Sequence, residues 1–186
     1  MLPRIFLTLA TAFGLSTAAG LNAYIPLFVV ALLSKTTTLI TLNEPYDALA
    51  TWWVIGVLGV LMAVEILINK VPVADTIDDI VHTFIRPAAG AILFAASTNV
   101  IGLHPALAAV CGVILAGGVH AAKSAARPLI TATTAGVGNP VVSTVEDAVS
   151  FITSVLAVVA PYLVVALLVA LGSVMLWWLV RRRRTR

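Results

Sequence analysis

Long apolar stretches alternate with short polar ones along this chain. The apolar stretches cover residues 5–33, 49–68, 88–103, 104–122 and 156–180. Most are close to the roughly 20 residues that an α-helix needs to cross a bilayer. The first contains AAGLNAYIP, in which Gly20, Asn22 and Pro26 each disfavour a continuous helix. The pattern predicts helical membrane spans, with a break inside the first.

One polar connection, SKTTTLITLNEPYDALA, separates the first two apolar stretches. Trp52 and Trp53 come just after it, which is typical of aromatic residues at a membrane–water interface. Near the other end, residues 141–180 are too long for a single span, and Pro161 offers a break between two helices. The pattern therefore predicts an all-α protein, a polytopic integral membrane helix bundle with five or six spans.

Two further segments, residues 72–86 and 140–154, have related sequences: PVADTIDDIVHTFIR and PVVSTVEDAVSFITS. At an offset of 68 residues, the proline, the threonine and the acidic pair of one segment coincide with those of the other. Internal repeats are a familiar construction of small transporters, which place their binding site between the repeats. We therefore expect a single membrane domain with one repeat unit at about 48–103 and a second at about 104–180.

The polar residues of each repeated segment fall on one helical face, because helical neighbours are three or four positions apart. They are Asp75, Asp78, Asp79, His82 and Arg86 in the first segment, and Ser143, Glu146, Asp147, Ser150 and Ser154 in the second. Apolar residues occupy the other face of the first segment. We expect two amphipathic or re-entrant helices whose polar stripes face each other, or a hydrated cavity, inside the bundle.

The composition indicates whether the surface of the protein faces lipid or water. Hydrophobic residues make up 61% of the 186 residues and charged residues only 10%, whereas a soluble domain has about a quarter charged residues. Most of the surface must therefore face the lipid bilayer. Arg4 and the sequence STAA imitate a signal peptide, but the apolar pattern continues beyond them through YIPLFVVALL, so we expect no cleavage there.

The net charge of +3 comes from the end of the chain, since residues 181–186 contain five of the eleven basic residues. A basic cluster after an apolar helix is typical of the cytoplasmic side. We expect a multi-pass protein of the inner (cytoplasmic) membrane with a cytoplasmic C-terminus. No basic domain or aromatic stacking platform supports nucleic-acid binding. Lys123 and Arg127 are interpreted as a second basic anchor at the membrane surface.

Charged side chains within apolar helices cost several kcal/mol unless they are paired or hydrated, and they persist there mainly to handle ions, protons or charged solutes. The expected ion- or substrate-binding residues are Asp75, Asp78, Asp79, His82, Arg86, Glu65, Lys70, Glu146, Asp147, Asn22 and Asn139. Asp75, Asp78 and Asp79 are the candidates for a metal or other cation, because they are close enough to share one. Glu65 and His82 are the candidates for proton transfer.

These residues favour a transporter of an ion or small polar solute, coupled to protons or a cation through a buried acidic cluster. We expect a homo-oligomer, because a chain this small seldom encloses a pathway alone. The motifs of zinc proteases, serine hydrolases and P-loop enzymes are absent from the sequence, so we expect neither an enzyme nor a cofactor. The alternative is a non-transporting scaffold, or a lipid-binding or assembly factor, whose polar stripes lie among headgroups. A lipid-processing enzyme would need its polar residues beside a lateral opening.

The sequences GLSTAAGLNAYIPL, VEILINKVPVADTIDDIVHTFIRPAAGAIL and STVEDAVS resemble a bacterial family of small integral membrane proteins that carries only a domain-of-unknown-function label. The resemblance covers nearly the whole chain. Its most specific positions are Glu65, Lys70, Pro72, Asp75, Asp79, Arg86 and Pro87. The family pattern has an acidic residue directly before the lysine, where this chain has Asn69. If that acid is a ligand in relatives, this chain binds more weakly or differently.

Overall fold

The computed structural model describes residues 2–68 and 72–161 and, beyond them, residues 163, 166, 170, 173, 177 and 181, with side chains throughout except at 72–80. Over 2–68 and 72–161 every regular element is a helix. The α-helices are α1 (Leu2–Leu21), α2 (Tyr24–Thr36), α3 (Trp52–Ile68), α4 (Pro72–Thr98), α5 (Pro105–Thr134) and α6 (Asn139–Val159). Two short 3₁₀ helices, η1 (Tyr46–Ala50) and η2 (Asn99–Ile101), lie in the connections.

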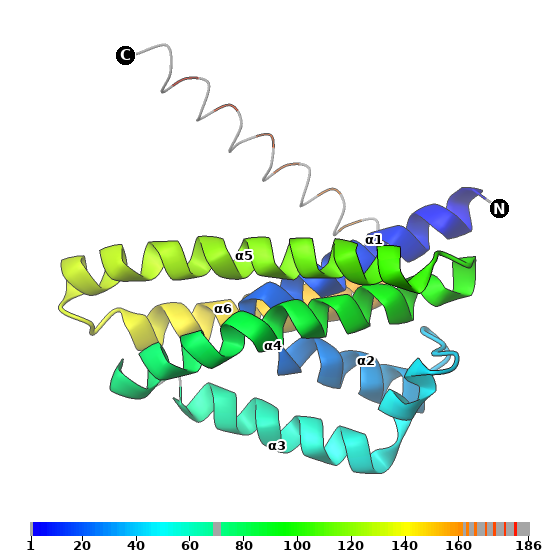
Figure 1. Cartoon of the computed structure of the whole chain (residues 1–186), viewed down its shortest axis with the longest axis horizontal. Helices are drawn as coiled ribbons and strands as arrows, with labels where there is room; N and C mark the ends of the chain where they lie inside the picture. Colours follow the sequence, from blue (N-terminus) through cyan, green and yellow to red (C-terminus); the bar gives the residue numbers. More distant parts are fainter. Residues whose placement is uncertain are drawn as a thin grey trace.

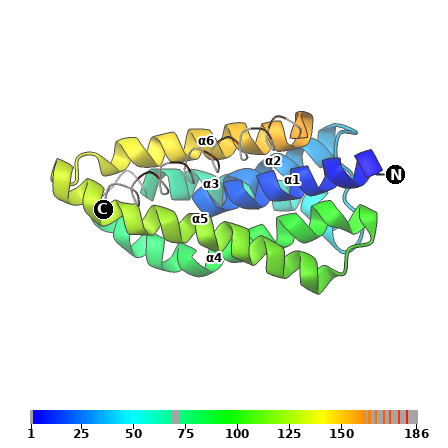
Figure 2. The ribbon, with the colours of Figure 1, turned by 90° about the horizontal axis from the view of Figure 1, so that it is seen from above.

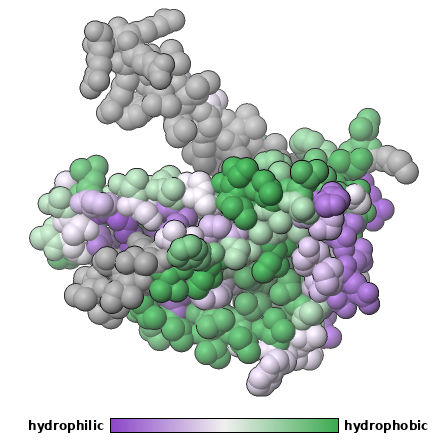
Figure 3. All heavy atoms as spheres, viewed as in Figure 1, coloured by the Kyte–Doolittle hydropathy of each residue, from purple (hydrophilic) through white to green (hydrophobic). Residues whose placement is uncertain are grey.

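The helices run side by side along the long axis of the molecule (Figure 1). Helix α1 is the central element, because it packs against α4, α5 and α6. Figure 2 shows it between α6 on one side and the α4–α5 pair on the other. Helix α2 packs against α3 and α6, and α3 forms the edge of the bundle. In Figure 3 apolar residues cover much of the middle of one face, and hydrophilic residues gather toward its ends.

Four helical segments are long and apolar enough to cross a membrane. They are Leu2–Leu21, Val81–Ile101, Pro105–Thr134 and Asn139–Val159. Tyr24–Thr36 and Trp52–Ile68 are shorter apolar helices. The predicted polytopic helix bundle is therefore confirmed. The further span predicted at residues 156–180 lies largely outside the described residues.

The break predicted in the first apolar stretch is present. Helix α1 ends at Leu21 and α2 begins at Tyr24, so only Asn22 and Ala23 separate them. Helix α2 then runs back toward the end of the bundle at which α1 begins (Figure 1). The two helices form a hairpin whose tip, at Asn22, is fully buried. Because backbone leaves the helical conformation there, the groups around the tip must satisfy its polar atoms.

The repeated segments are helical, as predicted, but each continues into a longer helix. Residues 72–86 and the expected span at 88–103 form the single helix α4, which passes through Pro87 without ending. Pro87 is only partly exposed and would contact a Cβ at Gly117 of α5. Neighbouring helices can support a proline inside a membrane helix, which explains why the predicted separation does not occur. Residues 140–154 likewise belong to α6.

Small residues bring the central helices unusually close. A Cβ atom added at Gly112 of α5 would overlap the backbone of Gly90 in α4. One added at Gly20 of α1 would lie 2.6 Å from the carbonyl oxygen of Ala116. Ser16 of α1 donates a hydrogen bond to the carbonyl oxygen of Gly90 at 3.0 Å. This close packing fixes α1, α4 and α5 relative to one another.

Candidate functional site

The tip of the α1–α2 hairpin is held by the side chain of Asn22. Its Oδ1 atom accepts hydrogen bonds from the backbone N–H groups of Tyr24, at 3.1 Å, and Ile25, at 3.0 Å. Its Nδ2 atom donates to Oδ1 of Asp147 on α6, at 3.0 Å. Asn22 therefore caps the start of α2 and links the hairpin tip to a buried carboxylate.

A lysine on α5 holds the other side of the same tip. Lys123 Nζ donates to the carbonyl oxygen of Leu21 at 3.2 Å and lies 2.9 Å from Oε2 of Glu146. Arg127 Nη2 lies 3.4 Å from the same Glu146 oxygen. The cation of Lys123 meets the C-terminal end of α1, where the helix dipole is negative. We call Asn22, Lys123, Arg127, Glu146 and Asp147 the hairpin cluster.

A second group of polar residues is centred on Arg86 of α4, which is completely buried. Its Nη2 donates to Oε1 of Glu65 at 3.2 Å, and its Nη1 contacts Nδ1 of His120 at 2.8 Å. His82 Nε2 lies 3.4 Å from the same Glu65 oxygen. His120 Nε2 contacts the hydroxyl of Thr83 at 3.1 Å. We call these five residues the arginine cluster.

The contacts of His120 define its protonation in this arrangement. A guanidinium can only donate, so Nδ1 of His120 accepts from Arg86. The ring is then neutral with its proton on Nε2, from which it donates to Thr83. A proton arriving at Nδ1 would have to displace the arginine. The contact between His120 and Arg86 therefore requires the imidazole proton to be on Nε2 and Nδ1 to be unprotonated.

The two clusters adjoin along one face of α5. Lys123 and Arg127 follow His120 by three and seven positions, so the three residues share a helical face. All three are buried. The charges of Arg86 and Lys123 act on each other electrostatically. The ring of Tyr24, next to the hairpin tip, meets the ring of His82 edge-on at 5.7 Å. The hairpin tip is thus the meeting point of both clusters.

Over the side chains that the structure describes, the network is balanced in formal charge. Three cations, Arg86, Lys123 and Arg127, accompany three carboxylates, which belong to Glu65, Glu146 and Asp147. Five of these six residues are less than 10% exposed, and the Glu146 side chain is 15% exposed. Pairing of this kind offsets much of the cost of removing charges from water.

The polar stripe predicted on the second repeat faces the interior. Four of its five members are buried on α6, namely Ser143, Asp147, Ser150 and Ser154, and the Glu146 side chain is 15% exposed. Ser150 donates to the carbonyl oxygen of Ala18 at 3.0 Å. At the start of α6, Asn139 Nδ2 donates to Thr131 at 3.0 Å, so this residue lies in its own contact with α5.

In the equivalent stripe of the first repeat, the structure describes the side chains of His82 and Arg86, and both are buried as well. Helices α4 and α6 both pack against α1, whereas the principal helix contacts of the described residues do not include a direct α4–α6 interface. The described parts of the two stripes are therefore joined through α1 and α5 and do not face each other.

The structure brings together two subsets of the predicted residues. Glu65, His82 and Arg86 meet in the arginine cluster. Glu146, Asp147 and Asn22 meet in the hairpin cluster. The predicted Lys70, and the side chains of Asp75, Asp78 and Asp79 proposed for a cation, lie outside the described residues. Among the side chains that the structure describes, no group of three or more His, Cys, Asp or Glu residues is placed to hold a metal.

Sequence reasoning missed the role of α5. Lys123 and Arg127 were expected as a basic anchor at the membrane surface, but they are 6% and 8% exposed and pair with Glu146. The reason is that α5 extends to Thr134, beyond the expected end of its span, and α6 presents a carboxylate to this extension. The spacing of His120, Lys123 and Arg127 on one face was the signal available.

The chain was compared with curated proteins, with solved structures and with models of protein families. Neither the curated proteins nor the solved structures give a match. The family model described as "Domain of unknown function (DUF4126)" matches residues 9–182. The match includes the hairpin tip and every residue of both clusters. Because it covers most of the chain, this protein belongs to the DUF4126 family.

Proposed function

We propose that this protein is a membrane transporter of an ion or small polar solute, coupled to protons or a cation through the two buried clusters. The observation that carries the proposal is the position of these clusters: charged side chains surround an interruption between two helices, inside a bundle apolar enough to span a membrane. Interrupted helices with charged residues at their ends are a recurrent design of transporter binding sites.

The energetics favour a functional origin for the network. Each charged side chain at membrane depth costs several kcal/mol unless it is paired or hydrated. Exchanging a buried ion pair for apolar residues is often neutral or stabilising, so stability alone gives little reason to keep one. Backbone that leaves the helix is tolerated at such depth only where protein or water satisfies it. A network that handles ions or protons accounts both for the buried charged side chains and for the interrupted helix beside them.

Residues of the arginine cluster have complementary roles in this proposal. Glu65 and His82 share one contact, so a proton can pass between a carboxylate and an imidazole without leaving the cluster. Arg86 balances the carboxylate when it is ionised. His120 accepts from Arg86 only while its Nδ1 is unprotonated, so protonation there would release the guanidinium.

In the hairpin cluster, Lys123 divides its contacts between the Leu21 carbonyl and Glu146. A cation or proton arriving at Glu146 would weaken the ion pair and leave Lys123 held by the helix end alone. Asp147 is tied to Asn22 and hence to the start of α2. Charge at the two carboxylates is thus coupled to the hairpin tip. By sequence, Lys70, Asp75, Asp78 and Asp79 are further candidates for handling the cation or proton in this proposal.

The proposal is tested with the purified full-length protein in liposomes that contain a pH-sensitive dye. An imposed pH gradient, with gradients of candidate cations in parallel experiments, measures coupled proton movement. We expect flux above that of empty liposomes and a loss of at least tenfold in Glu65→Gln and Asp147→Asn. Glu44→Gln is the matched control, because Glu44 is exposed in a connection. Equal flux in all variants, or none above empty liposomes, would contradict transport.

The charge balance of the clusters also suits a second function, that of a non-transporting scaffold or lipid-binding factor stabilised by internal ion pairs. Substituting Asp78 and Asp79 by asparagine separates the two functions. Transport predicts loss of flux with the fold intact, whereas a scaffold predicts unchanged flux together with an altered set of co-purifying partners.

Two finer proposals concern assembly and orientation. We propose a homo-oligomer in the inner (cytoplasmic) membrane, because few spans are available to enclose a pathway. The basic residues 181–186 favour a cytoplasmic C-terminus. Light scattering of the detergent-solubilised protein measures the oligomeric state. A protease-cleavable C-terminal tag, tested on intact and opened cells, determines the orientation. A monomer or an externally cleaved tag would contradict the respective proposal.

A further inference from the structure

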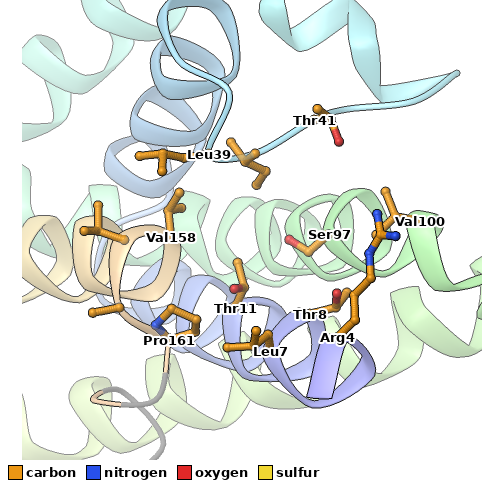
Figure 4. Close-up of a pocket in the computed structure, with 13 residues that line it drawn as sticks. Arg4, Leu7, Thr8, Thr11, Leu39, Thr41, Ser97, Val100, Val158 and Pro161 are labelled. Atoms are coloured by element: carbon orange, nitrogen blue, oxygen red, sulfur yellow. The ribbon is translucent and has the colours of Figure 1, made fainter. Parts of the chain in front are cut away.

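A cavity of about 570 Å³ lies at the end of the bundle where α1 begins. It is bordered by the first half of α1, residues 39–41, the end of α4 with η2, and the end of α6 (Figure 4). The rise along an α-helix places Arg4 about 25 Å from Leu21, which contacts the hairpin cluster. The cavity is therefore a separate feature from the site proposed above, and its volume is in the range of small-molecule sites.

The polar part of the cavity suits an anion. Among the described residues that line it, Arg4 is the only charged one. The hydroxyl groups of Thr8, Thr41 and Ser97 border the same space (Figure 4), whereas that of Thr11 already donates to the carbonyl oxygen of Ala157 at 2.8 Å. The first turn of α1 contains no acidic residue, so the positive end of its dipole is not offset there. A guanidinium and several hydroxyl donors are the groups that bind oxyacid anions.

Ser97 provides an independent sign that the cavity is made for a ligand. Its side chain borders the cavity but is only 7% exposed. Its Oγ atom has no hydrogen-bond partner within the part of the chain that the structure describes. A buried hydroxyl without a partner costs free energy, because it has given up its hydrogen bonds to water. An oxygen of a bound molecule would remove this cost.

The rest of the cavity is apolar, with Leu7, Val100 and Val158 among its walls. Helix α1 is long enough to cross a bilayer, so its first turn lies at the level of the lipid headgroups. A ligand that satisfies both parts has an acidic group at the arginine and an apolar chain along the walls. We propose that this cavity binds an oxyacid anion carried on an apolar chain, the chemistry of an anionic lipid.

Calorimetric titration of the detergent-solubilised, full-length protein tests the proposal. The ligand is dihexanoyl phosphatidic acid below its micellar concentration. Dihexanoyl phosphatidylcholine supplies the same chains without net charge, and inorganic phosphate supplies the acid without chains. We expect binding of the phosphatidic acid that is at least tenfold tighter than that of either comparison compound.

Three variants locate the site. We expect Arg4→Gln to weaken binding of the phosphatidic acid about tenfold, because it removes the charge-assisted contact. Ser97→Leu should weaken it by a similar factor, because it fills the cavity from the opposite wall. Lys35→Gln is the matched control: it removes an exposed cation near the same end of the bundle and should change binding less than about twofold.

Specific results would overturn the proposal. Equal binding of the phosphatidylcholine would mean that the cavity recognises only the chain. Displacement of the lipid by an equal concentration of phosphate would mean that a free anion is the ligand. Equal losses in Arg4→Gln and Lys35→Gln would mean that surface charge acts without a defined site. Arg4 is exposed, so its substitution leaves the fold intact and keeps the test decisive.

Discussion

Lys123 and Glu146 form an ion pair between α5 and α6, with 2.9 Å between Nζ and Oε2, while the same ammonium donates to the carbonyl oxygen of Leu21 at the end of α1. One side chain thus joins three helices at the point where the backbone leaves the helical conformation. It stabilises both a partly buried carboxylate and a helix terminus. Arg127 reaches the same carboxylate oxygen at the longer distance of 3.4 Å.

Lys123→Met should therefore destabilise the protein more than Arg127→Met. Loss of Lys123 leaves Glu146 with only the longer arginine contact and leaves the Leu21 carbonyl without its side-chain donor. We expect a loss of about 3 kcal/mol in the free energy of unfolding for Lys123→Met and about 1 kcal/mol for Arg127→Met. Unfolding by urea or SDS in mixed micelles measures both, with exposed Lys35→Met as the control. Equal losses would contradict a special role for Lys123.

Glu65 and Arg86 should behave as an energetically coupled pair. Either Glu65→Gln or Arg86→Gln leaves one buried charge without its main partner, which costs about 3–5 kcal/mol for a buried pair. The double variant removes both charges and should be less destabilised than the sum of the single variants by about 1–3 kcal/mol. The same micelle unfolding experiments give this coupling energy.

Additive losses in that cycle would show that the two residues act independently. Arg86→Lys serves as a further control. Lysine retains the charge but lacks the planar fork that reaches Glu65 and His120 together, so it should restore only part of the stability.

The membrane fold followed from composition and from the length of the apolar stretches, which are local properties of the sequence. The break at Asn22 was also predictable, because glycine, asparagine and proline within one span weaken a helix. Glu65, His82 and Arg86 were identified because charged residues in an apolar context stand out. These predictions depend on residue type and neighbours alone.

The connections between helices could not be predicted in the same way. Which carboxylate meets Lys123 depends on how far α5 and α6 extend and how α1 lies between them. His120 has no motif of its own, and its role arises from its contact with Arg86. Pro87 falls between the segment 72–86 and the span 88–103, which the sequence predicted separately, but it lies within α4, because packing between helices outweighs the local preference.

Asn22 and Asp147 offer a test by exchange of groups. Asn22→Asp keeps an oxygen to cap α2, but it loses the Nδ2 donor and places two carboxylates together where the Asn22–Asp147 contact is 3.0 Å long. We expect this variant to lose about 2 kcal/mol of stability, as for a broken buried hydrogen bond to a charged group. The double variant Asn22→Asp with Asp147→Asn restores a donor–acceptor pair in reversed order and should recover much of the loss. Failure of the double variant to exceed Asn22→Asp in stability would contradict a direct interaction.

Alanine substitutions at two glycines of α5 distinguish the effect of close helix packing on stability from the effect of helix propensity. An alanine at Gly112 would place its Cβ against the backbone of Gly90, where no side chain can rotate away, so α4 and α5 must move apart. At Gly118, six residues along the same helix, a Cβ would meet nothing within 4 Å. We expect Gly112→Ala to lose about 1–3 kcal/mol, as in an overpacked core, and Gly118→Ala to gain up to about 1 kcal/mol from helix propensity. Unfolding in micelles measures both values. Similar values for the two variants would contradict the close α4–α5 contact on which the position of Arg86 beside His120 depends.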